Sequence, residues 1–432
     1  MQTLLIAYRN LLQHGKRTAL LGSAIAGVAM LLLLLLGLSN GTRETMLRSA
    51  TTLSTGHVNI GGFYKVTAGQ SAPVVTKYKE LVEHVRKNVP ELDFVVTRGR
   101  GWAKAVSSGG SQQVGIAGVD IDAERDLRKV LVITSGNVDA LRTPGNVMLF
   151  EEQAKKLEVK VGDLITVSAP TLRGTNNTLD LTVGAIAQDV GLLSKFNVFV
   201  PAQSLRQLYR LNEDSTGAIQ LYLKEVKDVV AVQERLRKTL AEAGYGVMDN
   251  DPRAFFQKFE VVNREDWTGQ KLDLTTWEDE ISFTKWTLTA LDALTFLLTL
   301  ALLVVVGIGI MNTMAIAIRE RTREIGTLRA MGMQRGQVLR MFLAEAVLLG
   351  LFGAVAGALL GVVVSTTVNA LNIKVPIAVQ LFLMSDTLHV AIQGSAMAFT
   401  VAFITGCISL ISLVPSWMAA RLKPVTAMQH AG

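Results

Sequence analysis

The fold is decided by residues 293–332, which read ALTFLLTLALLVVVGIGIMNTMAIAIRERTREIGTLRAMG. Residues 293–318 carry no charge, and at about 1.5 Å per residue they are long enough to cross a hydrocarbon core of about 30 Å. Residues 319–332 are rich in arginine and end in a glycine, and a second apolar run begins near Phe342. We therefore predict a membrane helix, a short charged helix outside the membrane and an immediate return to the membrane. A loop this compact suits the docking of a partner better than it suits catalysis.

The composition agrees with a membrane protein that also has a large polar part. Of the 432 residues, 49% are hydrophobic and 18% are charged, and the net charge is +7. Much of the basic excess lies beside apolar runs, as the positive-inside rule expects, and this distribution argues against nucleic-acid binding. The single cysteine, Cys407, lies in an apolar run, so the polar part can contain no intramolecular disulfide.

The N-terminus predicts an amphipathic helix followed by a first span. Residues 1–17 place leucines on one helical face and polar side chains elsewhere, as in a helix that lies at a membrane surface. Residues 18–42 carry no charge. A cleaved signal peptide is the alternative, but its apolar core has about 7 to 15 residues and a small-residue cleavage site. This run is longer and lacks Ala-x-Ala near its end, so we predict an uncleaved membrane helix.

Three further spans lie in the C-terminal part. We place them at residues 286–318, 342–371 and 389–417, with a loop at 319–341, a short connection at 372–388 and a tail at 418–432. The third span contains Gly353, Gly357 and Gly361, and this small-xxx-small spacing favours close helix packing over mere tolerance of glycine facing lipid.

The polar middle, residues 43–285, predicts an α+β domain. It has no apolar run long enough for a span, and strand-like alternation is interrupted by turn signals and amphipathic helical segments. We expect residues 266–289 to return to the membrane as a helical stalk that continues into the second span.

Charge asymmetry predicts that both termini are cytoplasmic. Lys374 is the positive residue of the short connection between spans three and four, whereas eleven lie on the opposite side. Those eleven are Arg9, Lys16, Arg17, Arg319, Arg321, Arg323, Arg329, Arg335, Arg340, Arg421 and Lys423. The large domain then lies outside the cytoplasm, between the first and second spans.

Two motifs carry a family resemblance. Both resemble the FtsX-like permease module of MacB- and LolC/LolE-type ABC transporters. The first runs from Asn312-Thr-Met314 through residues 319–326 to Ala330-Met-Gly332, and the second is the tail that begins with Pro415-Ser-Trp. The resemblance implies a periplasmic domain with porter-like and sabre-like subdomains, the second inserted at about residues 122–212. It also implies that the loop at 319–341 is a coupling helix that meets an ATPase. The residues it assigns to this coupling are Arg319, Arg321, Arg323, Glu324, Arg329 and Gly332. The alternative for this loop is an anchor to lipid headgroups, which would also favour arginine.

The sequence offers no constellation for catalysis. It contains no Gly-x-x-x-x-Gly-Lys-Ser/Thr, so this chain should not bind ATP itself. The five histidines are scattered, and we expect His57 to be a strand or surface residue. Asp292 lies at the outer edge of a span, where a helix-end or interface carboxylate is expected rather than a proton relay. We therefore expect a non-catalytic subunit without cofactor or metal, with ATP and Mg²⁺ on the partner ATPase.

The resemblance implies a permease subunit of an inner-membrane ABC transporter, homodimeric or paired with a paralogue. Such a subunit couples ATP hydrolysis by a separate ATPase to motion of the periplasmic domain. The leading function that the resemblance implies is the release of lipoproteins from the inner membrane. The alternatives are MacB-like efflux of a small molecule or peptide, FtsX-like signalling to a cell-wall hydrolase, and a membrane-anchored binding module. The arginine-rich loop disfavours a simple anchor, and the size of the outer domain disfavours the signalling role.

A predicted hairpin marks a further contact site. Two strand-like segments at 161–167 and 179–183 flank residues 170–178, which are rich in turn formers. Leu172 and Arg173 are the apolar and the charged side chain of this tip. By resemblance to the protruding loop of LolC-type subunits, we expect them to contact a periplasmic carrier or adaptor. The alternative is an ordinary solvated hairpin.

Overall fold

A computed structural model of the protein describes residues 2–13, 15–67, 69–190, 194–282, 285–376, 379–380 and 387–421. The chain forms two compact units. One is helical and comprises Met1–Arg43, Leu288–Lys374 and Thr387–Gly432, and the other is an α+β unit of Glu44–Thr287 and Val375–Asp386. The predicted combination of membrane helices and one large α+β domain is therefore confirmed.

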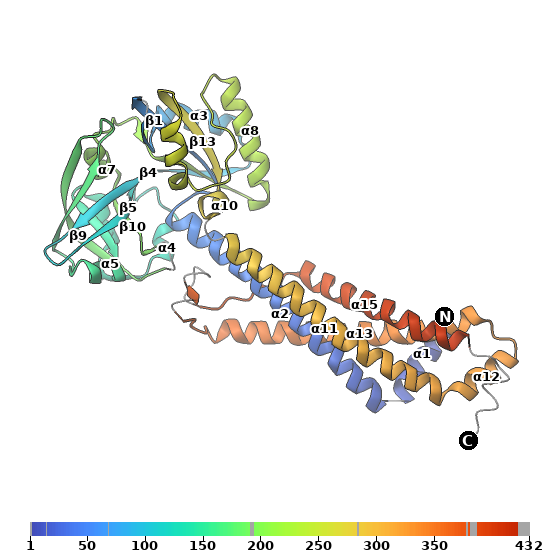
Figure 1. Cartoon of the computed structure of the whole chain (residues 1–432). Helices are drawn as coiled ribbons and strands as arrows, with labels where there is room; N and C mark the ends of the chain where they lie inside the picture. Colours follow the sequence, from blue (N-terminus) through green and yellow to red (C-terminus); the bar gives the residue numbers. More distant parts are fainter. Residues whose placement is uncertain are drawn as a thin grey trace. The chain divides into compact units, whose positions relative to one another are not determined.

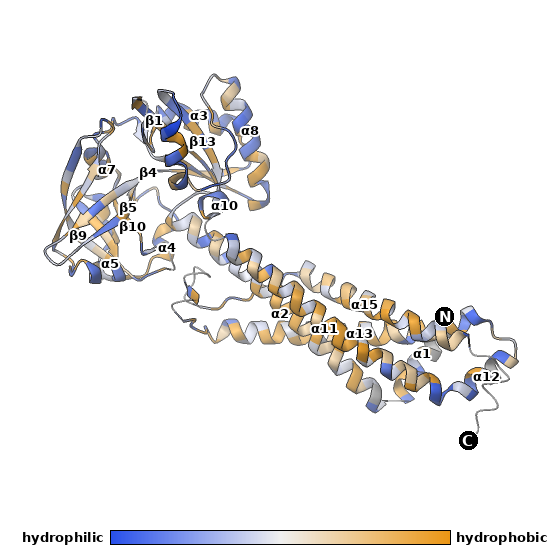
Figure 2. Cartoon of the chain, viewed as in Figure 1, coloured by the Kyte–Doolittle hydropathy of each residue, from blue (hydrophilic) through white to orange (hydrophobic). Residues whose placement is uncertain are grey.

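Four helices in the described part of the chain are long and apolar enough to cross a membrane, as predicted. Figure 2 shows hydrophobic residues along all four of them. They are α2 (Gly15–Leu53), α11 (Lys285–Glu320), α13 (Arg335–Ala370) and α15 (Gly394–Ala420). The short helix α1 (Gln2–Gln13) precedes them, and α12 (Thr322–Ala330) connects α11 to α13 (Figure 1).

Helix α2 is longer than the predicted first span, which ended at residue 42. It continues without a break through Arg43, Glu44 and Arg48 to Leu53. A helix satisfies its own backbone hydrogen bonds, so it need not end where the apolar run ends. The length of an apolar run predicts the span but not the end of the helix.

The glycines of the third span make the close helix contact that their spacing predicts. A Cβ atom at Gly353 would lie 2.8 Å from Ile25 Cγ2 of α2, and one at Gly361 would lie 3.1 Å from Leu33 Cδ2. At Gly357 the added atom would lie 2.2 Å from the backbone oxygen of Ala26. Because two backbones meet here, the contact leaves no room for a side chain. The packing interpretation is confirmed.

The α+β unit is built on one continuous sheet. Its order is β13-β1-β12-β4-β5-β10-β7-β9-β6, with β2 paired to β1 and β8 paired to β4 and β9. The long strand β4 (Leu92–Val106) belongs to two parts of this sheet: its first half pairs with β12 and its second half with β5. The first part also contains β1 (Val58–Thr67), β12 (Ala218–Leu223), β13 (Gly269–Thr276), α3 (Tyr78–Asn88) and α8 (Val229–Glu242) (Figure 1).

The second part of the sheet carries its own apolar core, formed by side chains of β4, β5, β7, β8, β9, β10 and α7. Its strands pair from Gly99 of β4 and Gly118 of β5 onward. The predicted insertion begins at residue 122, whereas the second part of the sheet already begins near Gly99 of β4. The remaining members are β5 (Ser111–Val119), β6 (Ile133–Gly136), β7 (Asn146–Phe150), α5 (Glu151–Lys156), β8 (Leu164–Pro170), β9 (Asn176–Ala187), β10 (Asn197–Pro201) and α7 (Ala202–Tyr209).

The predicted helical stalk at 266–289 is wrong over most of its length. Residues Gly269–Thr276 form the strand β13, which pairs antiparallel with β1, and α11 begins only at Lys285. Both faces of the strand are covered: Leu272 and Leu274 are buried, and the intervening Asp273 pairs with Lys258 at 2.8 Å. Because its ion partner supplies the compensating charge, an acidic residue can occupy a buried strand.

Candidate functional site

The candidate site is the connection between the second and third spans. Helix α11 ends at Glu320, α12 occupies Thr322–Ala330, and α13 begins at Arg335. Gly332 follows α12 with a φ of +104°, which glycine adopts readily and other residues do not. The amide of Gln334 donates to the side chain of Gln337 at 2.9 Å and caps the start of α13. Local sequence therefore fixes a short helix between two turns, as the predicted coupling segment requires.

Two side chains attach α12 and its entry turn to the helical bundle. Ile325 is 2% exposed and belongs to the apolar core that includes Val338 and Phe342 of α13. Arg321 is also buried, and its Nη1 lies 3.5 Å from Oε2 of Glu345 on α13. An apolar contact and an ion pair from the same short segment hold it against the third span.

The predicted coupling residues fall into two groups. Arg319, Arg323 and Glu324 are exposed, and Arg329 is half-buried, so these side chains form a charged surface. Arg321 does not share that surface, because it turns inward to Glu345. Gly332 supplies the turn. The segment thus has an exposed charged surface and a buried surface that packs against the third span. This arrangement is suited to a helix that binds a partner.

Sequence reasoning missed Glu345. It is the acidic residue of α13, and it lies within the stretch assigned to the third span. A carboxylate inside a predicted span is a functional or structural signal in itself. Its partner could not be identified from local spacing, because Arg321 lies 24 positions away in the chain.

Asp292 lies at the other edge of the second span, as predicted. Its Oδ1 accepts a hydrogen bond from Ser39 Oγ of α2 at 2.8 Å. The contact joins α2 to α11, which agrees with an interface carboxylate.

The predicted hairpin is present, with a tip shorter than expected. Strand β8 runs to Pro170, which pairs with Asn176 of β9, so residues 171–175 form the tip. Leu172 is half-buried and Arg173 is exposed. A Cβ atom at Gly174 would lie 2.9 Å from Oε1 of Gln70, so the tip rests near β2 (Gln70–Ala72). Arg173 is therefore accessible to a partner, whereas Leu172 is only partly so.

His57 is half-buried and is not itself a strand residue. It precedes β1, and its Nδ1 accepts a hydrogen bond from the amide of Leu223 at 3.0 Å. Burial lowers the pKa of His57 from its usual value. The ring of His57 thus contacts the backbone of β12 through an acceptor nitrogen.

Family models match two stretches of the chain. The MacB-like periplasmic core domain matches residues 18–239, which is more than half of the 432 residues. The FtsX-like permease C-terminal model matches residues 296–424 and so includes the α12 segment.

Known proteins match over very different lengths. The macrolide export ATP-binding/permease protein MacB of Campylobacter jejuni is 26% identical over 98% of this chain and 60% of the relative. The pyoverdine export ATP-binding/permease protein PvdT of Pseudomonas putida is 40% identical over 29% of this chain and 17% of the relative. The chain thus spans less than two thirds of the length of either relative.

A solved structure, the periplasmic region of MacB from Actinobacillus actinomycetemcomitans, is 14% identical with a TM-score of 0.30 and covers 44% of this chain and 85% of that one. The family assignment rests on the two models, one of which covers more than half of the chain. The protein is a multi-span membrane protein with a large extracytoplasmic domain, and it belongs to the family of FtsX-like permeases with a MacB-like periplasmic core domain.

Proposed function

We propose that this chain is the permease subunit of an ABC transporter and that α12 is where it receives the motion of the ATPase. The observation that carries the proposal is the two-sided arrangement of α12. Ile325 of α12 and Arg321 of its entry turn pack against the third span, while Arg323 and Glu324 of α12 and Arg319 at the end of α11 remain exposed. A rigid connection of this kind transmits displacement because packed helices deform little.

ATP and Mg²⁺ bind the partner ATPase in this proposal. The 432 residues contain no phosphate-binding Gly-x-x-x-x-Gly-Lys-Ser/Thr motif, and the relatives MacB and PvdT are named as ATP-binding/permease proteins. The exposed Arg323 of α12 and the exposed Arg319 at the end of α11 suit acidic side chains on that partner. A second copy of this chain, or a paralogue, completes the membrane part of the transporter.

We place both termini and α12 in the cytoplasm and the α+β domain in the periplasm of the inner membrane. The basic residues beside the spans support this orientation, because they gather on the side of α12.

Export of an envelope substrate is the activity we assign. The two relatives are named for macrolide and pyoverdine export, which favours efflux of a small molecule. Lipoprotein release is the second candidate, and the Pro415-Ser-Trp417 run favours it through its resemblance to LolC/LolE-type chains. FtsX-like signalling is less favoured, because the extracytoplasmic domain is large.

The docking proposal is tested by incorporating the photo-crosslinking residue benzoylphenylalanine at Arg323. We expect irradiation of whole cells to join this chain to a protein that contains the ATP-binding motif, identified by mass spectrometry. Val304, which is exposed halfway along α11, and Ile325, which is buried, provide control positions. Failure to capture an ATPase from Arg323, or equal capture from Val304, would reject both the docking site and its cytoplasmic location.

The hairpin tip is proposed to contact a periplasmic carrier or adaptor through Leu172 and Arg173. Deletion of residues 172–177 is a poor test, because Asn177 donates hydrogen bonds to the carbonyls of Gln207 and Leu208 and so supports the fold. We expect the double variant Leu172→Ser/Arg173→Glu to weaken partner binding by about tenfold or more, since few residues carry the affinity of such a contact.

Partner binding is measured by pull-down with the purified chain, and Lys160→Glu is the matched charge reversal, since Lys160 is exposed just before β8. Unchanged binding by the double variant would show that the tip is a solvated turn.

A further inference from the structure

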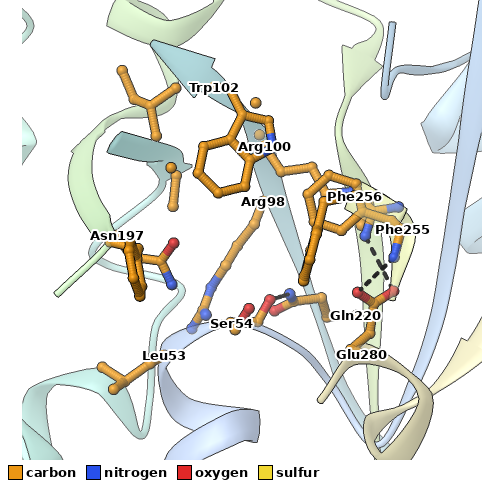
Figure 3. Close-up of a pocket in the computed structure, with 17 residues that line it drawn as sticks. Leu53, Ser54, Arg98, Arg100, Trp102, Asn197, Gln220, Phe255, Phe256 and Glu280 are labelled. Atoms are coloured by element: carbon orange, nitrogen blue, oxygen red, sulfur yellow. Dashed lines mark hydrogen bonds and ion pairs between the residues drawn. The ribbon is translucent and has the colours of Figure 1, made fainter. Parts of the chain in front are cut away.

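The extracytoplasmic domain contains a cavity of about 370 Å³ where the two parts of its sheet meet. Volumes of this order accommodate small molecules. The wall draws on the end of α2, the middle of β4, β5, the start of β10 and the segment before β13, all within the α+β unit (Figure 3). Its large apolar side chains are Leu53, Trp102, Ile116, Phe196, Phe255 and Phe256.

Three aromatic side chains of this cavity remain in contact with solvent. Trp102 is 39% exposed, Phe196 is 48% exposed and Phe256 is 37% exposed. The rings of Trp102 and Phe256 are 6.2 Å apart and nearly perpendicular. Exposed aromatic groups gathered at one opening are a recognised mark of a binding site, because they lose contact with water when a ligand covers them. The cavity is therefore suited to a ligand with an apolar body.

One side of the same cavity is polar. Arg98 is 2% exposed; its Nε and Nη2 each donate to Glu124 at 2.6 Å, and Nη2 also donates to the carbonyl of Thr52. Its Nη1 is buried without a hydrogen-bond partner among the described residues. A buried donor without an acceptor is costly, so this atom calls for an acceptor.

Arg100 adds a second donor. Its Nη1 reaches Glu280 at 3.4 Å and its guanidinium lies 4.0 Å from the ring of Phe255, while Nε is buried without an acceptor among the described residues. Dashed lines in Figure 3 join Arg100 to Glu280 and Gln220 to Ser54. The carboxylates of Glu124 and Glu280 leave parts of both guanidinium groups unused. Arg98 and Arg100, which both line the cavity, thus each keep one buried N–H group without an acceptor among the described residues, on the same side as the polar side chains of Ser54, Gln220 and Glu280.

We propose that this cavity binds an amphiphile whose apolar body lies against Trp102, Phe255 and Phe256 and whose carboxylate or carbonyl end accepts hydrogen bonds from Arg98 and Arg100. A carboxylate is the stronger acceptor for guanidinium groups. The inference goes beyond the coupling function and does not depend on it, since neither ATP nor the ATPase takes part in binding.

The test uses the full chain in lipid nanodiscs, without ATP or ATPase. The probe is a ten-carbon carboxylic acid that carries a photoreactive diazirine, and the control probe is the primary amine of the same chain length. We expect the carboxylate to label peptides that contain Trp102 or Phe256, unlabelled decanoate to compete, and the amine to label these peptides far less. Mapping the labelled peptides separates binding in the cavity from partition into the lipid.

Two variants probe the two ends of the ligand. Ala117 lines the cavity on β5 and is half-buried, so Ala117→Trp fills the space and should lower labelling by about tenfold. Arg100→Met should lower labelling by the carboxylate by about tenfold, since it removes a hydrogen bond to a charged group. Ala241→Trp, at an exposed site on α8, is the control for the added indole.

Competition by decanoate would show that a free carboxylic acid is sufficient as ligand. If decanoate failed to compete while a diacyl phospholipid did, the ligand would be a membrane lipid with the same acceptor chemistry. Labelling that survived both Ala117→Trp and Arg100→Met, or equal labelling by the amine, would overturn the proposal. If Ala117→Trp failed to fold, as judged by thermal unfolding, Arg100→Met alone would decide.

Discussion

Gly357→Leu is expected to separate the first and third spans and to abolish most of the correctly assembled protein. A Cβ atom at this position would lie 2.2 Å from the carbonyl oxygen and 2.8 Å from the Cα of Ala26. Both are backbone atoms of α2, so neither can turn aside as a flexible side chain could. Overpacking costs about 1–3 kcal/mol or more where the surroundings cannot adjust, and here two long helices would have to move apart.

The matched control is Gly27→Leu on α2. An added Cβ atom there has no heavy atom within 4 Å, and Gly27 is exposed. We expect size-exclusion chromatography in detergent to show a single sharp species for Gly27→Leu and mainly aggregated material for Gly357→Leu. A monodisperse Gly357→Leu protein with unchanged thermal unfolding would contradict the described contact between α2 and α13.

Arg321→Glu and Glu345→Arg are each expected to disrupt the attachment of α12, and the double exchange is expected to restore part of it. Both side chains are more than nine-tenths buried and approach to 3.5 Å. Breaking a buried ion pair by altering one partner costs about 3–5 kcal/mol, because the other charge is left uncompensated. In the double variant the opposite charges face each other again.

The readouts are thermal unfolding and ATP hydrolysis by the assembled transporter. We expect each single variant to lower both, and the exchange to recover stability more fully than hydrolysis, since the side chains differ in length. Arg340→Glu is the control, because Arg340 is exposed on α13 and its Nε donates only to the nearby carbonyl of Gly336 among the contacts described. Single variants as stable and active as Arg340→Glu would show that this pair does not hold α12.

The spans and the α12 segment could be predicted because their signals are local. An uncharged run as long as residues 293–318 has few alternatives to a membrane helix, and the charges that follow it mark where the membrane ends. Gly353, Gly357 and Gly361 of α13 were informative for the same reason, since helical spacing places them on one face.

The errors arose where a distant residue decides the outcome. The strand β13 resembled part of a stalk because Asp273 is acceptable in a buried strand only when Lys258 compensates it. Glu345 became meaningful only once Arg321 lay beside it. The cavity brings Arg98 together with Phe255 and Glu280 from the far end of the domain, and no pattern in a short window of sequence contains that information.

The most direct test of the account is ATP hydrolysis and substrate export by the reconstituted transporter carrying Arg323→Glu/Glu324→Arg. Both residues are exposed on α12, so the exchange should leave folding and membrane insertion intact while it inverts the charges offered to the ATPase. We predict that export falls to background and that the permease no longer changes the rate of hydrolysis by the ATPase. Wild-type export and wild-type stimulation of hydrolysis in this variant would contradict the assignment of α12 as the coupling element.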